Sequence, residues 1–363
     1  MENDGKVDLP DVKIKIIKKI RKRTMKLLRR IKVAVLNTFF PVRKDVEMLR
    51  RQIFATQRID LVEIDGFCLF VYMDDFFYRC VVRAEGKNRT PLAIKRAQQS
   101  TREIAGSGGS IDEFIAGWKS TEDADLLLLA QFVKSGRPFT LLDVGCLYGR
   151  TALRYGRFLR TFSCQAPVLC FDPGNAGALA PCNFVNNGYP EFQFQPYAIG
   201  DVDGFVLMHL EVGQNENNRI INRAHARYAT SRVVPARRLD SIMKDRDGDI
   251  FVKIDTQGAE FEVFAGLSEC IGRRTVAGLM EFFPAGLATR VRPETFLARL
   301  LETFIIFDIG AGHGRLERVT PQNAPLLVSK LKGQSFPYTD LLFFPQNMEG
   351  AEDLARRLGS MEK

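Results

Sequence analysis

The chain has 363 residues, of which 45% are hydrophobic, and this content excludes a wholly disordered protein. The net charge of +9 comes from residues 1–51, which hold 16 Lys and Arg against 6 Asp and Glu. The other 312 residues hold 36 against 37. The body of the protein is therefore neutral, and the basic excess describes what an N-terminal arm contacts.

Residue composition indicates the cellular compartment in which the protein works. Seven Cys without a Cys-x-x-C pair indicate reduced thiols, and three widely separated His lack zinc-ligand spacing. No apolar run approaches the roughly 18 residues that a membrane span needs. The acidic start is not followed by a secretory leader pattern. We expect a cytoplasmic protein without a bound metal.

The arm, residues 1–51, contains a basic segment over residues 12–36 without an acidic residue. Its apolar residues recur at helical spacing, which predicts an amphipathic helix. Such a helix is typical of attachment to an anionic membrane surface, here the inner face, and a solvated helix is the alternative. The residues that define the apolar face are Ile17, Ile20, Leu28, Ile31 and Val35.

Residues 52–135 are expected to form a small extension of hairpin and helices. The alternating run over 59–83 breaks at Asp65-Gly66 and at Asp74-Asp75, which predicts an antiparallel hairpin or meander. Helices are expected over residues 91–105 and 121–135. The Gly-rich stretch over 105–110 between them predicts a joint.

Residues 136–348 are expected to form one α/β domain, followed by a C-terminal helix over 349–363. Seven short apolar runs alternate with helical stretches, which predicts a doubly wound, mostly parallel sheet. The runs are residues 139–145, 166–173, 192–201, 250–258, 275–284, 304–310 and 339–345. The helical stretches are residues 149–161, 259–271 and 292–303.

The first run ends in a glycine turn that is suited to ligand binding. Asp143 closes the strand, and Gly145 and Gly149 open the next helix, where free N–H groups point outward. Asp172 ends the second run, a position at which an acid accepts hydrogen bonds from ribose hydroxyls. The Gly-x-x-x-Gly spacing favours an adenosyl ligand without a pyrophosphate. A similar stretch at 308–314 lies too near the C-terminus to begin such a domain.

Charged residues mark the ends of the fourth and fifth runs. Lys253, Asp255 and Glu260 lie where the fourth strand meets a helix, and Glu281 lies in an apolar run. Two readings stay open. Lys253 forms a structural ion pair with Glu281 or Asp255, or one of the two acids is a general base toward a hydroxyl.

These segments together resemble class I S-adenosylmethionine-dependent methyltransferases, and specifically the FkbM-type family, over roughly residues 139–310. The matching motifs are Asp143-Val144-Gly145 with Gly149, Phe171-Asp172-Pro173, Ala198-Ile199-Gly200-Asp201, Leu239-Asp240, Lys253-Ile254-Asp255 with Gly258-Ala259-Glu260, and Met280-Glu281-Phe282. Cys146 and Leu147 replace the family's Ala and Asn, Asp172 replaces Glu, and Gln257 replaces Glu.

The resemblance implies a Rossmann-like seven-stranded methyltransferase sheet and S-adenosylmethionine as cofactor. The cofactor's ribose would lie on Asp172 and its methionine end near Asp143 and Gly145, in the turn that also holds Cys146 and Gly149. Its adenine would lie near Ala198, Ile199 and Asp201. Asp255, Glu281, Lys253 and Glu260 would carry the chemistry, which in the family is commonly O-methylation of a sugar or polyketide-type hydroxyl.

Two other functions compete with this one. A nucleic-acid methyltransferase would use the arm to bind phosphates, but the sequence Ile-Asp-Thr-Gln-Gly at 254–258 lacks the motifs of base methylation. A degenerate fold serving as a membrane-surface interaction module would rest on Leu147 and Gln257. Residues 202–235 contain His209, Arg219, Arg223 and His225, which either line the acceptor cleft or lie on the surface.

Overall fold

The structure is a computed structural model, and it describes residues 59–72, 75, 109–118, 123–209, 219–221, 231–310, 316–332, 334 and 337–360. These residues belong to a compact unit over Gln57–Lys363, distinct from a unit over Met1–Thr56. The predicted arm, the helix over 91–105 and most of the Gly-rich stretch at 105–110 lie outside the described residues.

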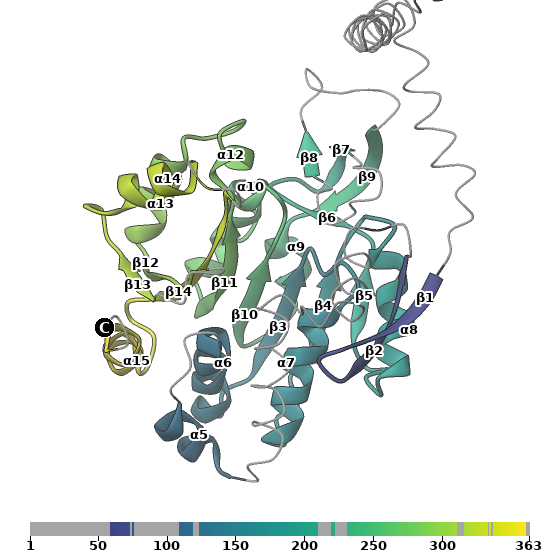
Figure 1. Ribbon diagram of the computed structural model, residues 1–363, viewed down its shortest axis with the longest axis horizontal. Helices are drawn as coiled ribbons and strands as arrows, with labels where there is room; N and C mark the ends of the chain where they lie inside the picture. The colour runs from purple at the N-terminus through teal and green to yellow at the C-terminus, as the bar shows by residue number, and fades with distance from the viewer. Residues whose placement is uncertain are drawn as a thin grey trace, which may run out of the picture. The chain divides into compact units, whose positions relative to one another are not determined.

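A mixed sheet forms the centre of the described unit (Figure 1). The strands β5, β4, β3, β10 and β11 are parallel, and β14 runs antiparallel between β11 and β12. Their order across the sheet is β13 (Glu317–Val319), β12 (Phe304–Asp308), β14 (Thr339–Pro345), β11 (Val276–Phe282), β10 (Asp249–Ile254), β3 (Phe139–Val144), β4 (Val168–Phe171) and β5 (Gln193–Gln195).

The expected seven-stranded sheet is wrong in two details. A short eighth strand, β13, pairs with the edge strand β12. The predicted strand over 192–201 divides, because Pro196 lacks the N–H that a continuing ladder needs. Its first part is β5 of the central sheet, and its second part, β6 (Ala198–Ile199), pairs in another sheet.

Helices cover both faces of the central sheet, so its inner strands are apolar on both sides. Alternate strand residues such as Leu141 and Leu142 enter two separate hydrophobic clusters. The first cluster includes α5 (Ile111–Gly117), α6 (Ala124–Ser135), α7 (Arg150–Thr161), α8 (Ala180–Asn186) and α15 (Ala351–Gly359). The second includes α9 (Leu239–Met243), α10 (Glu260–Ala265), α11 (Ser268–Ile271), α12 (Pro284–Leu287), α13 (Pro293–Leu301) and α14 (Ala324–Lys332).

A four-stranded sheet lies beyond the carboxyl ends of the central strands (Figure 1). Its order is β6, β9 (Ser231–Arg237), β7 (Gly204–His209) and β8 (Arg219–Ile221). Ala198, Met208, Val234 and Ala236 form its own small buried cluster. The sheet occupies residues 198–237, where the sequence predicted one strand end followed by an insertion.

The predicted hairpin is confirmed as β1 (Ile59–Ile64) and β2 (Phe67–Tyr72), joined at Asp65-Gly66. Both turn residues have positive φ, 55° and 72°, as a type I′ hairpin turn requires. The backbone of β2 is held by asparagines of α8 and its C-cap. Asn183 accepts from Phe70 N (2.6 Å) and donates to Phe70 O (3.2 Å), and Asn187 accepts from Cys68 N (2.9 Å).

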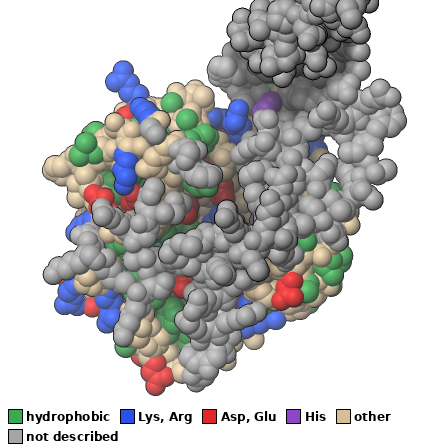
Figure 2. All heavy atoms as spheres, viewed as in Figure 1, with side chains coloured by type: hydrophobic (Ala, Val, Ile, Leu, Met, Phe, Trp, Pro, Cys, Tyr) green, Lys and Arg blue, Asp and Glu red, His purple; other side chains and the backbone are tan. Residues whose placement is uncertain are grey.

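The described surface has no dominant charge in the view of Figure 2, where acidic and basic side chains are interspersed. This agrees with the neutral composition of residues 52–363. None of the helices in the described ranges is both long and apolar enough to cross a bilayer. The short 3₁₀ helix η2 (Gly177–Leu179) precedes α8.

We predict that Asn183→Ala lowers the free energy of unfolding by about 2 kcal/mol, because its buried amide also donates to Tyr148 O and its loss leaves several backbone groups unpaired. Urea denaturation measures the change. Asn186→Ala is the control, since its exposed side chain donates one bond, to Cys68 O, and we expect a change below about 1 kcal/mol. Equal effects of the two variants would contradict this account.

Candidate functional site

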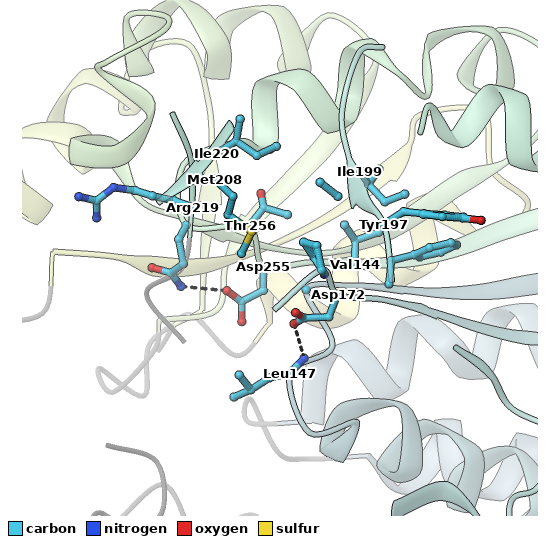
Figure 3. A pocket seen from close by; sticks show the side chains of 15 residues that line it. Val144, Leu147, Asp172, Tyr197, Ile199, Met208, Arg219, Ile220, Asp255 and Thr256 are labelled. Carbon is cyan, nitrogen blue, oxygen red and sulfur yellow. Dashed lines mark hydrogen bonds between the residues drawn. The ribbon is translucent and has the colours of Figure 1, made fainter. Parts of the chain in front are cut away.

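The carboxyl ends of β10, β3 and β4 lie side by side, since these strands are parallel neighbours. The residues that follow the three ends are Asp255, Gly145 and Asp172. A pocket opens at this edge (Figure 3). It is lined by Val144, Gly145, Leu147, Phe171, Asp172, Pro173, Tyr197, Ala198, Ile199, Met208, Arg219, Ile220, Asp255, Thr256 and Gln257.

The small sheet supplies the opposite wall of the pocket. Met208 of β7 and Ile220 of β8 are partners in the β7–β8 register, and both line the pocket. Figure 3 shows Tyr197 toward one end of the pocket and Arg219 toward the other, with Asp172 and Asp255 between them. The pocket therefore has an aromatic end and a charged end.

The turn after β3 needs glycine at position 145. Gly145 has φ of 79°, and a Cβ there would lie 1.8 Å from the backbone oxygen of Asp255. Gly145 N also donates to Phe171 O at 2.9 Å, which ties the turn to the end of β4. The backbone of this turn can therefore pass close to β10 and form the floor of the pocket.

Asp172 closes the same turn from the end of β4. Its Oδ2 accepts from Leu147 N at 2.9 Å, and its Oδ1 accepts from Gly174 N at 2.6 Å. Burial raises the pKa of Asp172, while these two backbone donors oppose the rise. Each carboxylate oxygen has two lone pairs, so each can accept one more hydrogen bond from a ligand.

Lys253 lies behind the pocket wall and joins three neighbouring groups. Its Nζ is 3.1 Å from Asp255 Oδ2, 3.2 Å from Gly145 O and 3.7 Å from Asp143 Oδ1. Burial alone would lower the pKa of Lys253, but Asp255 and Asp143 outweigh it and raise the pKa. Lys253 is therefore protonated, and the ion pair expected for it forms with Asp255.

Gln257 connects two carboxylates with one amide nitrogen. Its Nε2 donates to Asp255 Oδ1 at 3.0 Å and to Glu281 Oε2 at 2.6 Å. Burial raises the pKa of Glu281 well above its ordinary value, and the nearby Asp255 and Asp340 add to the rise. Glu281 thus favours its neutral form, whereas Asp255 faces the Lys253 ammonium.

Glu260 stabilises the loop between β10 and α10. It is fully buried, and its Oε1 accepts from Thr256 Oγ1 (3.0 Å) and Gly258 N (2.9 Å). Burial raises the pKa of Glu260 to about 7. Its contacts are those of a residue that shapes the wall on which Thr256 and Gln257 stand.

The structure brings together part of the predicted site. Gly145, Asp172, Ala198, Ile199 and Asp255 line the pocket. Asp143, Lys253 and Glu281 do not line it, but they are joined to Asp255 through ion pairs or through Gln257.

The other predicted residues lie outside the pocket lining. Cys146 and Glu260 are buried, and Asp201 is exposed. Gly149 begins α7 with φ of 80°, and a Cβ there would lie 2.3 Å from the Phe184 ring, so backbone conformation and packing explain this glycine.

Sequence reasoning missed most of the wall that the small sheet provides. Tyr197, Met208 and Ile220 line the pocket, and Arg219 takes the cleft position that was one of two alternatives for it. The short apolar runs Phe205–Met208 and Val233–Val234, rich in strand-forming residues, are the signal that could have indicated these strands. Arg223 and His225 lie outside the described residues. Among the described side chains, no group of three or more His, Cys, Asp or Glu is arranged to hold a metal ion.

Comparison with known protein families gives a match over part of this chain. Residues 172–284 match a family model described as the methyltransferase FkbM domain. The matched range runs from Asp172 to Pro284 and contains Lys253, Asp255 and Glu281, while the glycine turn precedes it. The resemblance to FkbM-type methyltransferases is confirmed over these residues, and it supports methyltransferase activity. No curated protein and no solved structure gives a significant match.

We predict that Gly145→Ala lowers the free energy of unfolding far more than Gly136→Ala. Both glycines have positive φ, 79° and 64°, but a Cβ at position 136 meets nothing within 4 Å. The control should therefore lose about 1 kcal/mol, and the clash with Asp255 O should add several kcal/mol at position 145. Chemical denaturation measures both values, and similar losses would show that the close approach is not limiting.

We predict that the stability of the protein falls as pH rises from about 5 to 8, in part through Glu260. Its folded pKa of about 7 exceeds the ordinary 4.5, so the folded state holds the proton that the unfolded state releases in this window. Below this window, protonated Glu260 contributes roughly 3 kcal/mol to the free energy of unfolding, and this contribution is lost by the upper end of the window.

Glu260→Gln removes this titration. Denaturation at several pH values should show that the free energy of unfolding falls less steeply with pH in the variant than in the wild type. The stability of the variant relative to the wild type should therefore increase as pH rises. A parallel pair of curves would assign the pH dependence to other groups.

Proposed function

We propose that this protein is an S-adenosylmethionine-dependent methyltransferase that methylates a hydroxyl oxygen of a sugar, a glycolipid or a polyketide-type small molecule. The observation that carries the proposal is the pair Asp172 and Asp255, which reach one pocket from strands on either side of β3. The FkbM domain match includes both residues.

The pocket suits an adenosyl ligand. Asp172 retains an accepting lone pair on each oxygen, as the two hydroxyls of a ribose require. Tyr197, Ile199 and Phe171 provide an aromatic and apolar end for the adenine. Gly145 lines the pocket without a side chain, and the methionine portion would lie against its backbone.

The chain's own residues position the acceptor and take its proton. When bound, the cofactor supplies a methyl group already activated by its sulfonium charge. Asp255 lines the pocket and Glu281 does not, so we assign the role of general base to Asp255. Lys253 and Gln257 each hold one of its oxygens and so fix the direction from which the carboxylate meets a hydroxyl.

The basic arm would attach the enzyme to an anionic membrane surface. Each Lys or Arg close to an anionic surface adds about 1 kcal/mol of attraction, and the remainder of the chain is neutral. We expect residues 12–36 to hold a cytoplasmic enzyme at the inner face of the membrane, close to glycolipid acceptors.

We predict that isothermal calorimetry detects binding of S-adenosylmethionine to the wild type, and that Asp172→Asn weakens this binding at least about tenfold. The amide NH2 would replace one accepting oxygen and face one of the two backbone N–H donors, and the exchange would remove the charge that favours the ribose hydroxyls. Asp245→Asn, an exchange at an exposed site, should bind as the wild type does. Absence of binding to the wild type would refute the proposal.

The same calorimetry separates cofactor binding from catalysis. Asp255→Asn should retain the cofactor yet lose transfer of labelled methyl groups to hydroxyl compounds of a cell extract. The outcome that contradicts the assignment is near-normal transfer by this variant, and loss in Glu281→Gln instead would move the role of base to Glu281.

A further inference from the structure

Arg219 is the charged residue at the end of the pocket away from Tyr197 (Figure 3). It belongs to β8, a strand of three residues, and its side chain is half-buried. Among the described residues, its guanidinium has no ion pair and no hydrogen-bond partner. Its charge is not needed to balance Asp255, because Lys253 already does so at 3.1 Å.

The strand that carries Arg219 is fixed to the wall that carries Gln257. Arg290 donates through Nη2 to Ile220 O and through Nη1 to Gly258 O at 3.2 Å. The same guanidinium pairs with Glu262 of α10. Arg290 therefore joins the chain neighbours of Arg219 and Gln257, two residues that line the same pocket.

Thr256 and Gln257, which line the same pocket as Arg219, offer hydrogen-bond acceptors, while their donors are used within the protein. The Thr256 hydroxyl donates to Glu260 and the Gln257 Nε2 donates to Asp255 and Glu281. Only one orientation of the Gln257 amide allows these bonds, so Oε1 is left as its accepting atom. A ligand group at this wall must bring its own donors, as a hydroxyl does.

We propose that the methyl acceptor is a hydroxylated anion, whose phosphate or carboxylate binds Arg219 while its hydroxyl groups donate to Asp255 and Gln257 Oε1. A planar guanidinium donates two parallel hydrogen bonds to such an anion, which makes arginine the suited cation here. This inference rests on the proposed function, and it narrows the acceptor class to hydroxyl compounds that carry a negative charge.

The test compares two probes that differ by the anion alone, glycerol and sn-glycerol 3-phosphate. Calorimetry with the full chain should detect the phosphate and a much weaker response to glycerol. Arg219→Ala should reduce the affinity for glycerol phosphate at least about tenfold, and Arg219→Lys should recover part of it. Arg273→Ala is the matched control, because Arg273 is highly exposed and lies outside this pocket.

Equal binding of both probes, or equal binding of glycerol phosphate by wild type and Arg219→Ala, would overturn the proposal. So would an effect of Arg219→Ala on S-adenosylmethionine alone, which would assign Arg219 to the cofactor's carboxylate. The titrations are run with and without the cofactor. Failure of cofactor binding would then refute the methyltransferase proposal separately from the anion site.

Vesicles distinguish the source of the anion. Arg219-dependent sedimentation with phosphatidylcholine vesicles that contain phosphatidylglycerol, reversed by soluble glycerol phosphate, would assign the anion to a lipid headgroup. Arg219-dependent binding of the soluble probe without such sedimentation would assign it to a free phosphate ester. Both results support the anion site, and loss of Arg219 dependence in both assays contradicts it.

Discussion

The site depends on one buried cation. Lys253 is the ammonium shared by the ends of β3 and β10, where it joins Asp143, Asp255 and the backbone of Gly145. Without it, the carboxylates at this edge would repel one another in a region that water does not screen well. The Lys253 ammonium bonds both the Gly145 carbonyl oxygen and the Asp255 carboxylate, so it holds the glycine turn close to the end of β10.

The acids around Lys253 outnumber it, and burial shifts several of them toward their protonated form. Burial raises the pKa of Asp143 to about 6 and that of Asp340 to about 7, and Glu281 lies directly across from Asp340 in the β11–β14 register. Like charges on opposed residues destabilise a sheet, so a neutral Glu281 is the stable arrangement. Gln257 fits this pattern, since a glutamate there would have placed a further charge between Asp255 and Glu281.

The central strands and the residues at their ends were predictable, because parallel strands buried on both faces read as continuous apolar runs and the acids interrupt them. Asp172 and Asp255 could be placed on this basis. The second sheet was missed, because Pro235 lies within one of its strands and two others, Ala198–Ile199 and Arg219–Ile221, have only two and three residues. The contact of Gly149 with Phe184, and the double hydrogen bond of Gln257, join segments whose distance in space no spacing along the chain reveals.

The asparagines that cover β2 have a further consequence. An exposed strand edge offers a row of N–H and C=O groups to any extended chain, which is how folded domains begin to aggregate. Side-chain amides from Asn183 and Asn187 already occupy the groups of Cys68 and Phe70, so that stretch cannot recruit another strand. A helix, unlike a strand, does not offer a new row of backbone groups to a further chain. The asparagines of α8 and its C-cap therefore protect this edge from self-association, although the strand has no charged residue.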